Sequence, residues 1–127
     1  MINGTNMNTN KVVAVMTLAA AASAASVAHA HAKIASSEPT PDSAMQGAPK
    51  AIRLHFNEAL EPAFSKIELF DAKQAAVVLP KVAVDKEDPT TMSTTVPALK
   101  SGKYSVRWTT MTHDGHKAKG QYSFTVK

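Results

Sequence analysis

Beyond residue 32 the chain alternates apolar and polar residues in short runs, which proline, glycine, aspartate and serine separate. In the clearest run, residues 103–109, Tyr104, Val106 and Trp108 fall on one side. A two-residue period places alternate side chains on opposite faces of a β-strand. No window keeps a helical period, so the pattern predicts an all-β domain with its apolar faces turned into a core.

About seven runs are expected as strands, at the spacing of an Ig-like sandwich. They cover residues 33–36, 51–56, 65–70, 77–79, 91–96, 103–109 and 120–126. Ile52, Leu54 and Phe56 share the predicted core face of the second run, which leaves His55 on the surface. Residues 57–64 are expected as an irregular connection or a single helical turn ending at Pro62. The charged stretch 81–89 is expected as a solvated loop.

Residues 1–30 have the three parts of a secretory signal peptide, which leaves residues 31–127 as the mature domain. A polar start carries Lys11, an apolar stretch runs from Val12 into an alanine-rich tract, and small residues mark the cleavage site. The stretch is too short and too alanine-rich for a membrane anchor. Cleavage after Ala30 exposes His31 as the N-terminus, whereas cleavage after Ala28 leaves that histidine third in the chain.

The two cleavage products would bind a metal in different ways. An N-terminal His31 binds a metal through its α-amine and its ring, and Asp114 with His116 completes a nitrogen-and-oxygen set of the kind that Cu(II) prefers. With His31 in third position, the amine, two deprotonated backbone amides and the His31 ring could instead wrap Cu(II) and leave Asp114 and His116 without a role. We therefore favour cleavage after Ala30. His113 lies close enough to compete as an alternative ligand, and Met111 is expected to fill a packing gap.

Composition narrows the chemistry further. The sequence has no cysteine, which excludes disulfides, thiolate zinc sites and cysteine nucleophiles. The formal net charge is +4, but the lysines are spread along the chain. A nucleic-acid-binding protein concentrates its basic residues on one element, so we expect no nucleic-acid partner.

The chain resembles the CopC-type periplasmic copper-binding proteins over essentially the whole of residues 31–127. The matching motifs are His31-Ala32-Lys33, Ser37-Glu38-Pro39, Leu54-His55-Phe56-Asn57-Glu58, Gly102-Lys103-Tyr104-Ser105-Val106-Arg107-Trp108 and Asp114-Gly115-His116. The resemblance implies a seven-stranded Greek-key β-barrel or sandwich, Ig-like or cupredoxin-like. It also implies one Cu(II) held by His31, Asp114 and His116, with Glu58 near the amine as a residue that orients a ligand.

Some members of this family also hold Cu(I) in a methionine-rich loop. The corresponding stretch here, residues 74–91, contains no methionine, so we expect the Cu(II) site alone. The implied function is that of a monomeric, non-enzymatic periplasmic carrier or buffer in copper resistance and homeostasis. Its expected partners are a copper transporter of the CopD type in the inner membrane or a periplasmic copper oxidase.

Two other functions remain open from the sequence. A small histidine-brace copper-dependent mono-oxygenase would share the N-terminal histidine and a second histidine, but the chain lacks the larger domain and the flat aromatic surface that such enzymes use. An Ig-like adhesion or assembly module with incidental histidines would bind no metal stoichiometrically.

Overall fold

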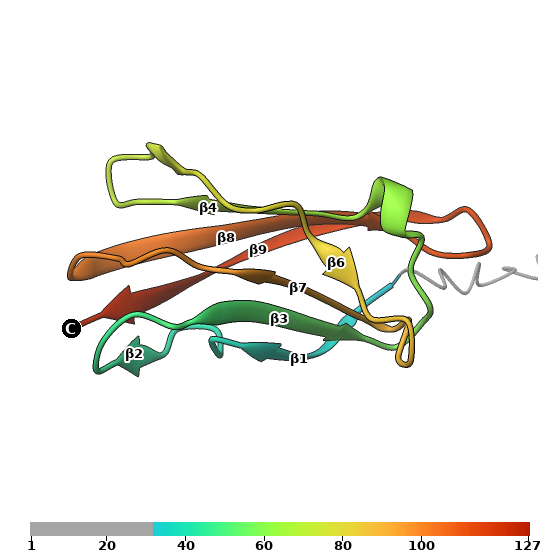
Figure 1. Ribbon diagram of the computed structural model, residues 1–127, viewed down its shortest axis with the longest axis horizontal. Helices are drawn as coiled ribbons and strands as arrows, with labels where there is room; N and C mark the ends of the chain where they lie inside the picture. The colour runs from blue at the N-terminus through green and yellow to red at the C-terminus, as the bar shows by residue number, and fades with distance from the viewer. Residues whose placement is uncertain (1–31) are drawn as a thin grey trace, which may run out of the picture.

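The computed structural model describes residues 32–127, which form two β-sheets packed face to face (Figure 1). The elements are β1 (Ile34–Glu38), β2 (Ala44–Met45), β3 (Ala51–Phe56), the 3-10 turn η1 (Pro62–Phe64), β4 (Lys66–Phe70), β5 (Ala76–Val77), β6 (Ala83–Val84), β7 (Thr91–Thr95), β8 (Gly102–Met111) and β9 (Lys117–Val126). Among these residues, one sheet has the order β1-β3-β7-β6 and the other β2-β9-β8-β4-β5. The predicted all-β sandwich is confirmed. The expected leader, residues 1–30, lies outside the described residues.

The apolar faces of the two sheets form the core as the alternation predicted. Ile52, Leu54 and Phe56 are buried on β3, and Tyr104 and Trp108 are buried on β8. The edge of one aromatic ring meets the face of another where Phe56 and Trp108 cross between the sheets, with ring centroids 4.9 Å apart. Such pairs add to the free energy gained by burying the rings.

Three local predictions were wrong. The two-residue strands β2 and β6 were not expected, because strands this short depend on pairing with β9 and β7 rather than on a pattern of their own. The helical turn begins at Pro62 instead of ending there, because proline suits the first helical position, where no N–H is needed. Strands β8 and β9 run further than expected and leave only residues 112–116 as their loop. Within residues 32–127 no helix has the length and apolar character needed to span a membrane.

Gly120 on β9 lies directly under the ring of Trp108, its partner across the β8–β9 ladder. A Cβ atom at residue 120 would lie 2.5 Å from Cζ2 of Trp108, closer than any unstrained contact. The indole therefore occupies the space that any other residue would need for its side chain.

Replacing Gly120 by alanine is expected to lower the free energy of unfolding by about 1–3 kcal/mol, because the Trp108 ring must move within a packed core. Urea unfolding followed by the fluorescence of Trp108, the single tryptophan of the chain, measures this. The exposed neighbour Gln121→Ala is the matched control and should leave stability nearly unchanged. Equal stability of Gly120→Ala and the unaltered protein would contradict the packing described.

Candidate metal centre

Residues Thr112 to His116 form a narrow loop between β8 and β9. The N–H of Thr112 donates to the carbonyl of His116 at 2.9 Å, and the N–H of Gly115 donates to the carbonyl of Thr112 at 2.9 Å. Gly115 has a φ of 89°, a left-handed conformation that glycine adopts without steric cost. The turn at Gly115 brings Asp114 and His116 side by side.

Asp114 and His116 form a polar pair that the structure holds in place. Nδ1 of His116 lies 3.1 Å from Oδ2 of Asp114, and both side chains are about half exposed. The Thr112 hydroxyl donates to the other carboxylate oxygen of Asp114. That hydrogen bond, followed by the charge of His116, lowers the pKa of Asp114 below its usual value of 3.8. Because Nδ1 of His116 and Oδ2 of Asp114 face each other, one metal ion placed between them could take both atoms as ligands.

The segment 57–61 connects this loop to the start of the described chain. The N–H of Lys33 donates to Oδ1 of Asn57 at 2.8 Å, and the N–H of Asn57 donates back to the carbonyl of Lys33 at 3.1 Å. Further along the segment, the N–H of His113 donates to the carbonyl of Ala59 at 3.2 Å. The start of β1 and the β8–β9 loop therefore lie at the same end of the sandwich, the right-hand end in Figure 1. His31 immediately precedes this start but lies outside the described residues.

Glu58 lies in the middle of that segment and has an unusual environment. Its Oε2 atom is buried and has no hydrogen-bond partner among residues 32–127. A buried carboxylate oxygen without a donor is costly, so such atoms are normally paired. This oxygen is therefore available to accept a hydrogen bond from a group beyond those of residues 32–127. This observation agrees with the orienting role that the resemblance implies for Glu58.

The remaining histidine of the loop turns elsewhere. Nδ1 of His113 lies 3.4 Å from Oε1 of Glu61, and this histidine is more exposed than His116. Residues 32–127 contain no group of three or more metal-binding side chains. The described part of the predicted ligand set is thus the pair Asp114 and His116.

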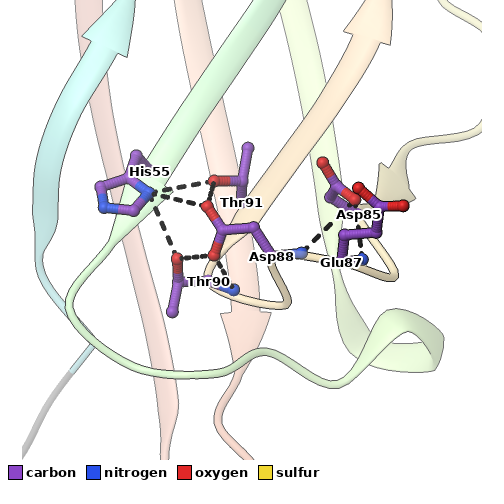
Figure 2. A network of polar contacts seen from close by, with 6 residues as sticks. All are labelled: His55, Asp85, Glu87, Asp88, Thr90 and Thr91. Carbon is purple, nitrogen blue, oxygen red and sulfur yellow. Dashed lines mark hydrogen bonds and ion pairs between the residues drawn. The ribbon is translucent and has the colours of Figure 1, made fainter.

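A second polar network lies at the same end of the molecule, around His55 (Figure 2). Nδ1 of His55 lies 3.0 Å from Oγ1 of Thr91 and 3.6 Å from Oδ2 of Asp88. The Asp88 carboxylate also accepts the Thr91 hydroxyl at 2.9 Å and the N–H of Thr90 at 3.2 Å. His55 points away from the core as predicted. The prediction of a merely solvated loop over residues 81–89 was wrong, because Asp88 orders its end.

The Asp88 network also supports the segment beside the metal loop. The carbonyl of Thr90 accepts the N–H of Phe56 at 2.8 Å, and the carbonyl of Pro89 accepts the N–H of Leu60 at 2.8 Å. These bonds fix both ends of the stretch that carries Glu58. Sequence reasoning missed this network because Asp88 lies 33 positions from His55 and no local motif links the two residues.

Comparison with known proteins shows which protein family the chain is similar to. A family model described as the CopC domain matches residues 34–127. The chain is 33% identical over 101 residues to copper resistance protein C of Xanthomonas campestris pv. juglandis, covering 75% of this chain and 79% of that protein. It is also 28% identical over 94 residues to the copper transport protein CutJ of Bacillus subtilis, of which those residues make up only 17%.

Solved structures agree with the family match. CopC from Methylosinus trichosporium OB3b superposes with a TM-score of 0.73 at 29% identity, covering 76% of this chain and 94% of that one. PcoC, a methionine-rich copper resistance protein from Escherichia coli, gives a TM-score of 0.68 at 35% identity, covering 77% and 100%. The two-sheet architecture is therefore the cupredoxin-like sandwich of these proteins, as the resemblance implied.

Asp88→Asn is expected to destabilise the fold at neutral pH, because it removes the charge that the Thr90 and Thr91 hydroxyls and His55 stabilise. These hydrogen bonds lower the pKa of Asp88 below 3.8 in the folded state. The stabilisation is therefore present above the unfolded pKa and is lost as pH falls through the folded pKa. Urea midpoints of the two proteins should differ at pH 7 and converge in acid below that range.

Glu87→Gln is the matched control for this variant, since it removes one charge from the same loop. Its carboxylate makes no hydrogen bond or ion pair within residues 32–127. A similar, pH-dependent loss in Glu87→Gln would assign the effect to net charge and contradict the network.

Proposed function

The chain belongs to the CopC family, and from this premise we propose that it binds one Cu(II) ion in the periplasm and carries or buffers it for copper resistance and homeostasis. Its function is related to copper, as are the names of its relatives. The observation that carries the proposal is the pairing of Asp114 with His116 at the end of the sandwich where the described chain begins.

The proposed ligands are the amine and imidazole of His31, the carboxylate of Asp114 and the imidazole of His116. Ala32, the first described residue, is buried at 4% exposure, and consecutive Cα atoms are only about 3.8 Å apart. An anchored Ala32 limits how far His31 can lie from this end of the fold. Three nitrogens and one oxygen suit Cu(II) in tetragonal geometry.

Glu58 is proposed to accept a hydrogen bond from the amine of His31. Its unpartnered, buried Oε2 atom supplies the acceptor that this role requires. A residue in such a position orients the ligand and raises its basicity, and its loss typically lowers metal affinity by about 10–100-fold.

The proposed mechanism is binding and exchange, without covalent chemistry. Asp114 and His116 are half exposed, so an incoming ligand can reach a metal there without unfolding the site. In this proposal the leader, residues 1–30, directs export and is cut after Ala30. The partners are a CopD-type transporter of the inner membrane or a periplasmic copper oxidase. The match to a small part of a protein named for copper transport supports the first partner.

Processed protein beginning at His31 should bind one Cu(II) tightly in a competitive titration. A single residue added in front of His31 should abolish tight binding, because it removes the free amine from the imidazole it chelates with. Affinity should also fall with acidification, since the amine and both histidines coordinate only when deprotonated. Binding that is indifferent to the extension, or constant from neutral pH through the histidine pKa range, would place the ligands elsewhere.

His116→Ala and His113→Ala form a matched pair in the same loop for this titration. We expect a large loss of Cu(II) affinity for His116→Ala and little change for His113→Ala, whose ring is paired with Glu61 instead. Glu58→Gln should fall between them. A larger loss of Cu(II) affinity for His113→Ala than for His116→Ala would make His113 the ligand in place of His116.

A separate Cu(I) site is not expected. Met45, Met92 and Met111 are the methionines outside the leader, and Met92 is fully buried in the core. Cu(I) selects clustered thioether or thiolate ligands, which the chain does not supply. The double variant His31→Ala with His116→Ala should therefore lose to a chromophoric Cu(I) chelator at every ratio tested. Tight Cu(I) binding by that variant would contradict a Cu(II)-only protein.

A further inference from the structure

An apolar groove lies beside the proposed metal loop, on the outer side of the larger sheet. It has a volume of about 480 Å³ and is lined by Phe64 of η1 and by residues 109–111 and 117–119. The turn η1 lies next to β8 in Figure 1. Met111 lines this groove and is only partly buried. The groove shares the pair Met111 and Lys117, the last rung of the β8–β9 ladder, with the base of the loop.

Phe64 is 57% exposed, yet its turn is firmly held. The Ser65 hydroxyl donates to the carbonyl of Glu61 at 2.8 Å and accepts a hydrogen bond from the Thr110 hydroxyl at 2.8 Å. The N–H of Glu61 also donates to the carbonyl of Met111 at 2.8 Å. Because the turn is fixed at both ends, the exposed ring is presented in a set position, as an aromatic anchor at an interface would be.

The rim of the groove is basic. Lys117 and Lys119 are exposed on the outward face of β9, and neither forms an ion pair within the part of the chain described. A neighbouring groove shares Thr109 and Lys119 and extends along the same face to Arg107. Around the two grooves the cations Lys117, Lys119 and Arg107 outnumber the single carboxylate, that of Glu68. An apolar floor with a net positive rim complements an acidic peptide segment with an apolar side chain.

We propose that this surface docks an extended protein segment in which one large apolar side chain, flanked by carboxylates, enters the groove between Phe64 and Met111. The purpose of this docking, copper exchange, rests on the proposed function. A partner seated in the groove would lie directly against the loop that carries Asp114 and His116. An anionic membrane fits less well, because a groove admits a side chain rather than inserting into lipid.

The test uses metal-free protein processed to His31, labelled with nitrogen-15, and two synthetic eight-residue peptides with blocked ends. One peptide centres a leucine among glutamates, and the other centres it among lysines. The acidic peptide should shift the amide resonances of residues 109–111 and 117–119, and the basic peptide should not. Shifts that map elsewhere, equal binding of both peptides or no shifts at the highest peptide concentration would overturn the proposal.

Variants give the chemical origin of the binding. Phe64→Ala should lower the affinity for the acidic peptide by about tenfold, the loss typical of an aromatic anchor. Val78→Ala should leave that affinity unchanged, since Val78 is the other exposed large apolar residue among those described. Lys117→Glu with Lys119→Glu should abolish binding. Lys103→Glu is the control, because this exposed lysine lies on the same strand pair at its far end. Equal losses in targets and controls would contradict the assigned surface.

Two further measurements exclude the other occupants. Flotation with vesicles of mixed neutral and anionic phospholipid that depends on Phe64 would overturn the proposal in favour of a membrane. Self-association that depends on Phe64 would overturn it in favour of a second copy of the chain.

A Cu(II) titration of Phe64→Ala separates the docking proposal from the proposed copper-binding function. Unchanged copper affinity with lost peptide binding is expected, whereas failure of copper binding in every variant and in the parent protein would count against the proposed function alone.

Discussion

The hydrogen bonds of the irregular segment 57–61 hold the functional end of this molecule together. On one side Asn57 exchanges two hydrogen bonds with Lys33 at the start of the described chain. On the other side Ala59 and Glu61 bond to His113 and Met111 of the β8–β9 hairpin. Without this segment, no hydrogen bonds of this stretch would link the start of β1, in one sheet, to the β8–β9 loop of the other sheet. Their spacing is therefore set by backbone geometry rather than by a flexible side chain.

An irregular segment can have this role only because it is anchored in the core. Leu60 is fully buried and Thr112, which faces it across an isolated bridge, is buried at 2% exposure. Buried backbone groups must find partners, and across this bridge the N–H of Glu61 donates to the carbonyl of Met111 and the N–H of His113 donates to the carbonyl of Ala59. The carbonyls of Pro89 and Thr90 satisfy two more N–H groups of the same stretch, and the Asp88 network fixes that loop in turn. The geometry around Glu58 is thus determined from three directions.

The sequence predicted what depends on short-range periodicity and failed where distant segments meet. Alternation identified the core faces of β3 and β8, because a two-residue period survives in a single strand. The pair Asp114 and His116 was also visible, since only one residue separates them and that residue, Gly115, marks a turn. The contact of His55 with Asp88 was not, because it depends on the register of β3 against β7. The role proposed for Glu58 came from family resemblance alone, and its buried oxygen is visible only in the fold.

Under the proposed function, a copper carrier must hold its ion and also release it, and the two requirements would fall on different parts of this end of the fold. Rigidity comes from the segment 57–61 and the buried residues beneath it. Access comes from Asp114 and His116, which remain half exposed above that support. Because the hairpin that carries these two residues also forms one wall of the Phe64 groove, a docked partner would contact the ligand loop without disturbing the buried anchor. Exchange can then proceed by ligand substitution at the surface while the fold stays closed.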